Sequence, residues 1–234
     1  MKQFKPINPF DLIFPKICLN CGIRINSDEK FLCNNCFSSL HYFSENYCEI
    51  CGGLKEENSC RICETNDFLF DKARSAYQLN STLSKLIHSF KYEEMTSLGK
   101  FMAIQTAEFV RKYNPFEKVD FITPVPLHTV KTRIRGFNQA EVLSAEIGKN
   151  LNIRHLSNLV LRKRFTETQT KLSRKNRIKN VSNAFGLNKK YNIKRKNILI
   201  IDDVFTTGST VNAICSTLKN SGADKVFVLT IARA

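Results

Sequence analysis

The chain has 234 residues, enough for one large domain or two small ones with a buried core. Apolar residues make up 42% and charged residues 24%, which is ordinary for a globular protein, and no apolar run reaches the roughly 18–20 residues of a membrane helix. Lys and Arg number 36 against 21 Asp and Glu, a formal net charge of +15. This surplus favours an anionic partner such as a phosphate ester, a nucleic acid or an anionic membrane surface, with a merely solvated basic surface as the alternative.

The first 17 residues contain a short apolar stretch that Asp11 and Pro15 interrupt, and no small-residue cleavage site follows it. A secretory signal peptide is therefore not expected. We expect a cytosolic protein, with a position at the inner face of the membrane left open. Stable disulfides are rare in the cytosol, so the nine cysteines need another explanation.

Eight of the cysteines form four CxxC pairs. The pairs are Cys18/Cys21, Cys33/Cys36, Cys48/Cys51 and Cys60/Cys63. Two thiolates at this spacing can bind one tetrahedral ion, so four pairs predict two structural four-cysteine Zn2+ sites. The first and third pairs both open a CxxCG sequence, and this repeat favours two tandem ribbons over redox-active motifs or iron–sulfur ligation. Sequential pairing within each ribbon is preferred, and a cross-braced arrangement stays open. Cys215 is expected to be a small core residue.

Charge and cysteine content divide the chain near residue 66. Residues 1–66 carry 7 basic and 8 acidic residues, whereas residues 67–234 carry 29 and 13. We therefore predict a small zinc-ribbon domain over residues 1–66 and a second domain over residues 67–234.

Strands and helices alternate along the second domain. Strands are predicted near residues 73–79, 119–125, 197–201 and 225–231, and helices near 82–90, 96–113, 138–151 and 210–220. The continuous apolar run at 197–201 is typical of a strand buried on both faces of a parallel sheet. The alternation predicts an α/β domain.

The most specific motif follows the strand at 197–201, where Asp202 and Asp203 precede a loop of small residues. The loop residues are Thr206, Thr207, Gly208, Ser209 and Thr210. Ligands of open α/β sheets bind at the carboxyl ends of the strands. Two carboxylates there can accept hydrogen bonds from sugar hydroxyls or engage a hydrated Mg2+, while the loop and the next helix N-terminus suit a phosphate. The loop lacks the lysine of a P-loop, so a ribose 5-phosphate fits better than a nucleoside triphosphate.

This string resembles the phosphoribosyl pyrophosphate (PRPP) signature of the type I phosphoribosyltransferases. Two further segments resemble the ComF family, the phosphoribosyltransferase-like proteins of bacterial natural competence. They are Pro124-Val-Pro-Leu-His128 with Arg135-Gly-Phe-Asn-Gln139, and the spaced residues from Arg164 to Phe185. The resemblance extends over nearly the whole chain and includes the cysteine ribbon. It implies a type I phosphoribosyltransferase-like α/β fold with a parallel sheet flanked by helices, PRPP and Mg2+ as ligands, and a role in DNA uptake.

The resemblance also implies residue roles. Asp202 and Asp203 would contact the ribose hydroxyls, and the loop at 206–210 would bind the 5-phosphate. The loop at 126–136 would receive pyrophosphate through Lys131, Arg133 and Arg135, with Arg135 as the preferred catalytic cation.

A strongly basic segment lies between residues 154 and 196, with 14 basic residues and one acid. Part of it, 162–180, would form the mobile hood that closes over PRPP in this fold. The candidate residues are Arg162, Arg164, Gln169, Arg174, Arg177 and Lys179. The same charges suit the phosphates of single-stranded DNA, and a membrane-surface role stays open.

Three functions remain compatible with these observations. In the first, the chain is a PRPP-using transferase whose acceptor the sequence does not name. In the second, it binds PRPP or single-stranded DNA beside competence-machinery proteins and has no turnover. The third is a zinc-ribbon adaptor whose second domain is a relic. The intact acid pair and phosphate loop argue against the relic.

Overall fold

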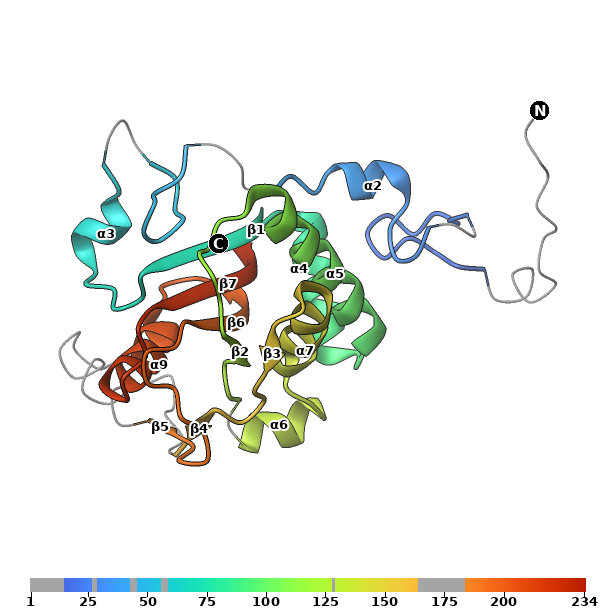
Figure 1. Ribbon diagram of the computed structural model, residues 1–234. Helices are drawn as coiled ribbons and strands as arrows, with labels where there is room; N and C mark the ends of the chain where they lie inside the picture. The colour runs from blue at the N-terminus through green and yellow to red at the C-terminus, as the bar shows by residue number, and fades with distance from the viewer. Residues whose placement is uncertain (1–14, 27–28, 43–45, 56–58, 128, 164–183) are drawn as a thin grey trace, which may run out of the picture.

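The computed structural model describes residues 15–26, 29–42, 46–55, 59–127, 129–163 and 184–234. A central sheet carries helices on both faces, and the two cysteine-rich ribbons lie apart from each other, on different parts of this α/β unit (Figure 1). In the part of the chain that the structure describes, no helix combines the length and apolar character needed to cross a membrane.

The sheet has five parallel strands in the order β1-β7-β6-β2-β3. The strands are β1 (Lys72–Gln78), β2 (Phe121–Pro124), β3 (Arg154–His155), β6 (Ile198–Phe205) and β7 (Val226–Arg233). Four of them were predicted, and β3 is too short to leave a sequence pattern. One expectation was wrong: the ladder of β6 with β7 continues past Ile201 as far as the Phe205–Arg233 pair. Asp202 and Asp203 therefore lie within the strand. Their polarity hid this continuation of the strand in the sequence.

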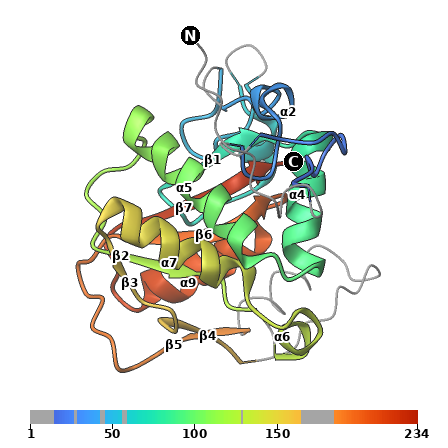
Figure 2. The same cartoon turned by 90° about the vertical axis from the view of Figure 1, so that its right-hand side faces the viewer.

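Helices cover the sheet in two layers (Figure 2). These helices are α4 (Ser81–Tyr92), α5 (Thr96–Tyr113), α7 (Gln139–Leu151) and α9 (Ser209–Asn220), and the shorter α6 (Thr129–Arg135) lies beyond the end of the sheet (Figure 2). Side chains alternate along β6, so Leu199 and Ile201 join the core with α4, α5 and α7, whereas Ile198 and Ile200 join the core with α9. An antiparallel pair, β4 (Val160–Arg162) with β5 (Phe185–Leu187), lies outside the sheet.

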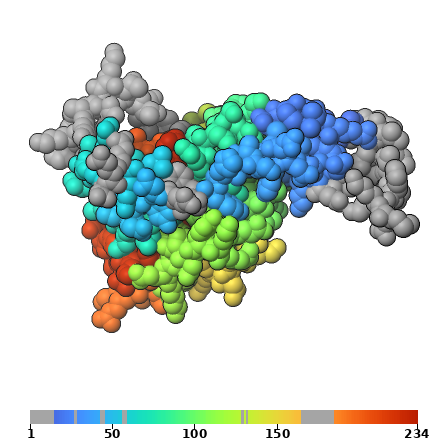
Figure 3. All heavy atoms as spheres, turned by 90° about the horizontal axis from the view of Figure 1, so that it is seen from above, coloured from blue at the N-terminus to red at the C-terminus, as the bar shows by residue number. Residues whose placement is uncertain are grey.

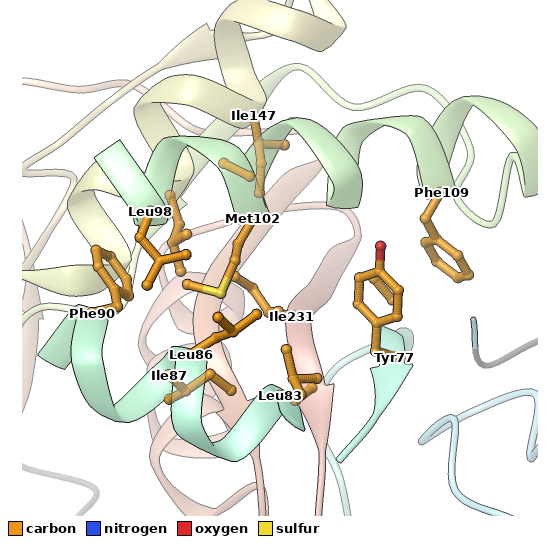
Figure 4. Close-up of a cluster of buried hydrophobic side chains, with 14 of the residues drawn as sticks. Tyr77, Leu83, Leu86, Ile87, Phe90, Leu98, Met102, Phe109, Ile147 and Ile231 are labelled. Carbon is orange, nitrogen blue, oxygen red and sulfur yellow. The ribbon is translucent and has the colours of Figure 1, made fainter. Parts of the chain in front are cut away.

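The larger core fixes the position of α4 against the sheet. Leu83, Leu86 and Phe90 of α4 are at most 1% exposed and pack with Met102 of α5 and Ile231 of β7 (Figure 4). Burial of such side chains contributes about 1.5–3 kcal/mol each. The C-terminal turn of α4 is thereby held at the carboxyl edge of the sheet.

Each ribbon contains one short helix and packs on a different part of the second domain. The helices are α2 (Asn34–Ser38) and α3 (Arg61–Thr65). The first ribbon lies on α4 and α5, where the ring of Phe31 is 5.4 Å from that of Phe101 and Lys85 donates to the carbonyl of Asn20 at 2.8 Å. The second lies beside β1, where the amide of Ala73 donates to the carbonyl of Ile50 at 2.7 Å. Figure 3 shows the first ribbon, in blue, beside the green surface of the helices.

Candidate functional site

The structure assembles both predicted cysteine groups. One contains Cys18, Cys21, Cys33 and Cys36, and the other contains Cys48, Cys51, Cys60 and Cys63. Within each group all sulfur atoms lie within 4.8 Å of one another, and the Cys51 and Cys60 sulfurs are 3.5 Å apart. Four sulfurs at about 2.3 Å from one ion would be roughly 3.8 Å apart, so the spacing fits Zn2+ and is far too long for a disulfide. Pairing is sequential within each ribbon, as predicted, and the cross-braced alternative is wrong.

Backbone geometry in the second group favours the thiolate form of Cys48. Gly52, at φ +68°, lets the chain turn after Cys51, and a side chain there would come within 2.7 Å of the Ala73 carbonyl oxygen. Burial opposes ionisation of Cys48, but the amides of Cys51 and Ile50 donate to its sulfur and lower its pKa to about 7. A lowered pKa favours the form that binds metal.

A second site lies at the carboxyl edge of the sheet. Asp202 lines a hollow together with the loop that follows β6. The remaining lining residues include Val204, Thr206, Thr207, Gly208, Ser209, Thr210 and Thr230. Gly208, at φ +73°, precedes α9, so the helix N-terminus opens into the hollow. Backbone amides, hydroxyls and a helix dipole there form the environment that a phosphate requires.

Asp203 points to the other face of β6. Its Oδ2 atom lies 2.9 Å from Nζ of Lys91, and the two side chains are 14% and 20% exposed. Lys91 is the penultimate residue of α4, which the core holds against the sheet. Lys91 was not predicted as a site residue, because a single lysine at the end of an amphipathic helix is usually solvated.

Arg135 completes the charge arrangement. It lies at the end of α6, donates to Oε1 of Gln139 at 3.2 Å, and has its guanidinium carbon 5.4 Å from the ring of Tyr92. The charges of Lys91 and Arg135 both favour ionisation of Asp202. The structure therefore brings Arg135 close enough to the acid pair for their charges to interact. Lys91, which was not predicted, belongs to the same group of charges.

The other predicted residues are only partly placed. The segment 126–136 contains α6 rather than an open loop, and Arg133 is exposed on it. Lys131 lies on the same helix. Arg162 lies on β4 with its guanidinium 5.5 Å from the ring of Phe185. Arg164, Gln169, Arg174, Arg177 and Lys179 lie outside the described residues, as does His128.

The carboxyl group of Asp202 predicts a pH-dependent stability. Burial, and next the charge of Asp203, raise its pKa from the ordinary 3.8 to about 7. The folded chain holds this proton more tightly than the unfolded chain, so stability from this group is lost as pH rises from about 4 to 7. An asparagine does not titrate, so Asp202→Asn should gain stability over the wild type across this range, reaching on the order of 4 kcal/mol above pH 7. Urea denaturation at a series of pH values measures the difference.

Asp120 provides the matched control at the opposite edge of the sheet. The Asn197 amide holds its pKa below the ordinary value, so Asp120→Asn should lose stability at neutral pH. A pH profile of Asp202→Asn parallel to that of the wild type would contradict the raised pKa.

Comparisons with known proteins identify the two parts of the chain. The double zinc ribbon domain matches residues 10–65, and the phosphoribosyl transferase domain matches residues 135–234. Competence protein F of Haemophilus influenzae is 30% identical over 226 residues, which cover 93% of this chain and 96% of that protein. The chain belongs to the ComF family.

Other relatives of this ComF protein match it along nearly their whole length. The DNA utilization protein YhgH of Escherichia coli O6:H1 is 29% identical, over 95% of this chain and 99% of its own. Competence protein ComFC of Streptococcus pneumoniae is 26% identical, over 92% and 99%. Among solved structures, the glutamine PRPP amidotransferase from B. subtilis has a TM-score of 0.41 and 18% identity, covering 58% of this chain and 26% of that one. The predicted family, the phosphoribosyltransferase-like α/β fold and the zinc ribbons are confirmed.

Proposed function

We propose that this ComF protein binds PRPP with Mg2+ at the carboxyl edge of its sheet and acts in DNA uptake. The observation that carries the proposal is the hollow that Asp202 shares with the phosphate-type loop, which is the loop at residues 206–210. Asp203, Lys91 and Arg135 lie beside it. The names of the relatives, competence protein and DNA utilization protein, support the role in DNA uptake.

The arrangement suggests how PRPP would lie. The 5-phosphate would accept hydrogen bonds from the loop and the start of α9, and the ribose hydroxyls would donate to Asp202 and Asp203. Lys91 would have to leave Asp203 for the sugar to reach it. The ammonium group would then be free to contact the pyrophosphate, together with Arg135.

Mg2+ fits the donor set at this edge. Carboxylate oxygens are hard ligands, and the acid pair can hold a hydrated ion beside the sugar. When bound, Mg2+ would neutralise charge on the pyrophosphate. The chain's own contribution to ribosyl transfer would come from Lys91 and Arg135, because fixed cations stabilise the charge that builds on a departing pyrophosphate.

Calorimetric titration of PRPP into zinc-loaded protein, with and without Mg2+, tests the proposal. Saturable binding that strengthens with Mg2+ is expected. No heat of binding at millimolar PRPP would refute the site, and the basic segment would then become the place to seek the function.

Single-stranded DNA is a second candidate ligand. Lys189, Lys190 and Lys194 are exposed on the described part of the basic segment and form no ion pair with any described residue. Such free cations neutralise DNA phosphates in a salt-dependent manner. This binding would not require the acid pair, which separates the two ligands experimentally.

A further inference from the structure

A buried arginine lies between the second zinc site and the phosphate-type loop. Arg233, the last residue of β7, is 5% exposed. Its Nη1 atom donates to the carbonyl oxygen of Cys51 at 2.6 Å, and its Nη2 atom lies 3.8 Å from the Cys51 sulfur. A guanidinium removed from water needs such acceptors, so its position depends on where the ribbon holds Cys51.

The other side of the same guanidinium faces the strand that leads into the loop. Its carbon atom lies 4.5 Å from the ring centroid of Phe205, and the amide of Ala234 donates to the Phe205 carbonyl at 3.1 Å. Phe205 is 2% exposed and ends β6, one residue before Thr206. Arg233 therefore fixes the position of the Phe205 ring, directly before the first residue of the loop.

The loop rests directly on this ring. A side chain at Gly208 would come within 2.7 Å of the Phe205 ring and 2.9 Å of the Phe68 ring. Phe68 follows the second ribbon in the chain, and Asn212 of α9 binds the same segment by accepting from the amide of Leu69 at 2.6 Å. The left-handed turn at Gly208 is thus packed against residues that the second ribbon positions.

The first ribbon has a different environment. Its described contacts go to α4, α5 and β1, including the stacked rings of Tyr42 and Tyr77 at 4.8 Å. The two zinc sites are therefore attached to different parts of the second domain.

We propose that Arg233 is a positioning residue that ties the phosphate-type loop to the second zinc site. Zinc binding at the second site then determines how well ordered the conformation of the loop is, whereas zinc binding at the first site has no such effect. The second site consists of Cys48, Cys51, Cys60 and Cys63. The consequence for ligand affinity rests on the proposed function, but the order of the loop can be measured without any ligand.

The test compares two buried arginines that hold the same ribbon. Arg74 is 4% exposed, donates to the Glu49 carbonyl at 3.0 Å and pairs with the Glu49 carboxylate at 2.8 Å. We expect Arg233→Met and Arg74→Met both to accelerate zinc release to a chelator. Only Arg233→Met should raise amide hydrogen exchange over residues 206–211 of zinc-loaded protein and weaken PRPP binding, by about tenfold.

A third variant keeps the test decisive if Arg233→Met does not fold. Phe205→Leu removes the ring while Arg233 keeps its hydrogen bond to the Cys51 carbonyl, so it should raise exchange in the loop while zinc release stays near the wild-type rate. Exchange over 206–211 that is equal in all variants, or raised equally by Arg74→Met, would overturn the proposal. If the wild type does not bind PRPP but Arg233→Met still raises amide hydrogen exchange over residues 206–211, the positioning role of Arg233 stands. Only the proposed ligand is then refuted.

Discussion

Replacing Asp202 and Asp203 together by asparagine is expected to weaken PRPP binding about 100-fold or more. Hydrogen bonds to charged groups contribute roughly 1.5–3 kcal/mol each, and the neutral amide oxygens of asparagine would accept only the weaker, uncharged hydrogen bonds from the ribose hydroxyls. The substitution keeps the shape of each side chain, and it also relieves the repulsion between Asp202 and Asp203. Fold and zinc content should therefore persist. Calorimetric titration in the presence of Mg2+ gives the affinity.

Three comparisons make this result specific. Asp120→Asn changes an acid at the far edge of the sheet, beside Lys196, and should leave PRPP affinity unchanged. Inorganic phosphate has no hydroxyl pair for the acids, so its binding to the double variant should not weaken. Single-stranded DNA binding should also persist, because the basic segment lies elsewhere in the sequence. A double variant that binds PRPP as the wild type does would refute the assignment of the acid pair.

Loss of one ligand from the second zinc site is expected to have the largest effect on stability. Cys51 is 0% exposed, and a ribbon of this size has too little apolar core to fold without metal. Cys51→Ser should lower the free energy of unfolding by roughly 4 kcal/mol, which corresponds to about 10 °C in the melting temperature. Thermal melts followed by calorimetry, with a metal assay on the same samples, measure both quantities.

Cys215 supplies the control for this experiment. It is buried in α9 outside both cysteine groups, and burial raises the pKa of its thiol. Cys215→Ala should therefore retain two zinc ions per chain. A Cys51→Ser variant that also keeps two zinc ions and its melting temperature would contradict the assignment of the ligands.

The parts of the fold that could be predicted from the sequence are those that depend on residues close together in the chain. The helix predicted over 96–113 coincides with α5, and the helix predicted over 138–151 matches α7 to within one residue. The cysteine spacing identified both metal sites, because two ligands two residues apart need little tertiary information. The acid pair and loop were found for the same reason, since they are contiguous in the chain.

The parts that escaped prediction depend on contacts between distant segments. Lys91 contacts Asp203, which lies 112 residues further along the chain, only because α4 packs on the sheet. Arg233 reads as a surface cation at the end of an apolar strand, yet it is buried against a ribbon 182 residues away. No local periodicity encodes either neighbour, and the length of β6 was misjudged because Asp202 and Asp203 interrupt its apolar run before the strand ends at Phe205.

The alternation of side chains at the end of β6 has a stereochemical consequence. Asp202 opens toward the loop and α9, whereas Asp203 opens toward α4. A pentose phosphate held by the loop and by both acids would be fixed at three points that do not share one face of the strand. The strand and the loop line the hollow, so the ligand would enter from its open side only, and with that direction fixed its mirror image could satisfy the loop and one acid but not both. The ordinary pleat of a single strand thus gives this edge of the sheet a handedness, and the site would distinguish a sugar from its enantiomer before any chemistry begins.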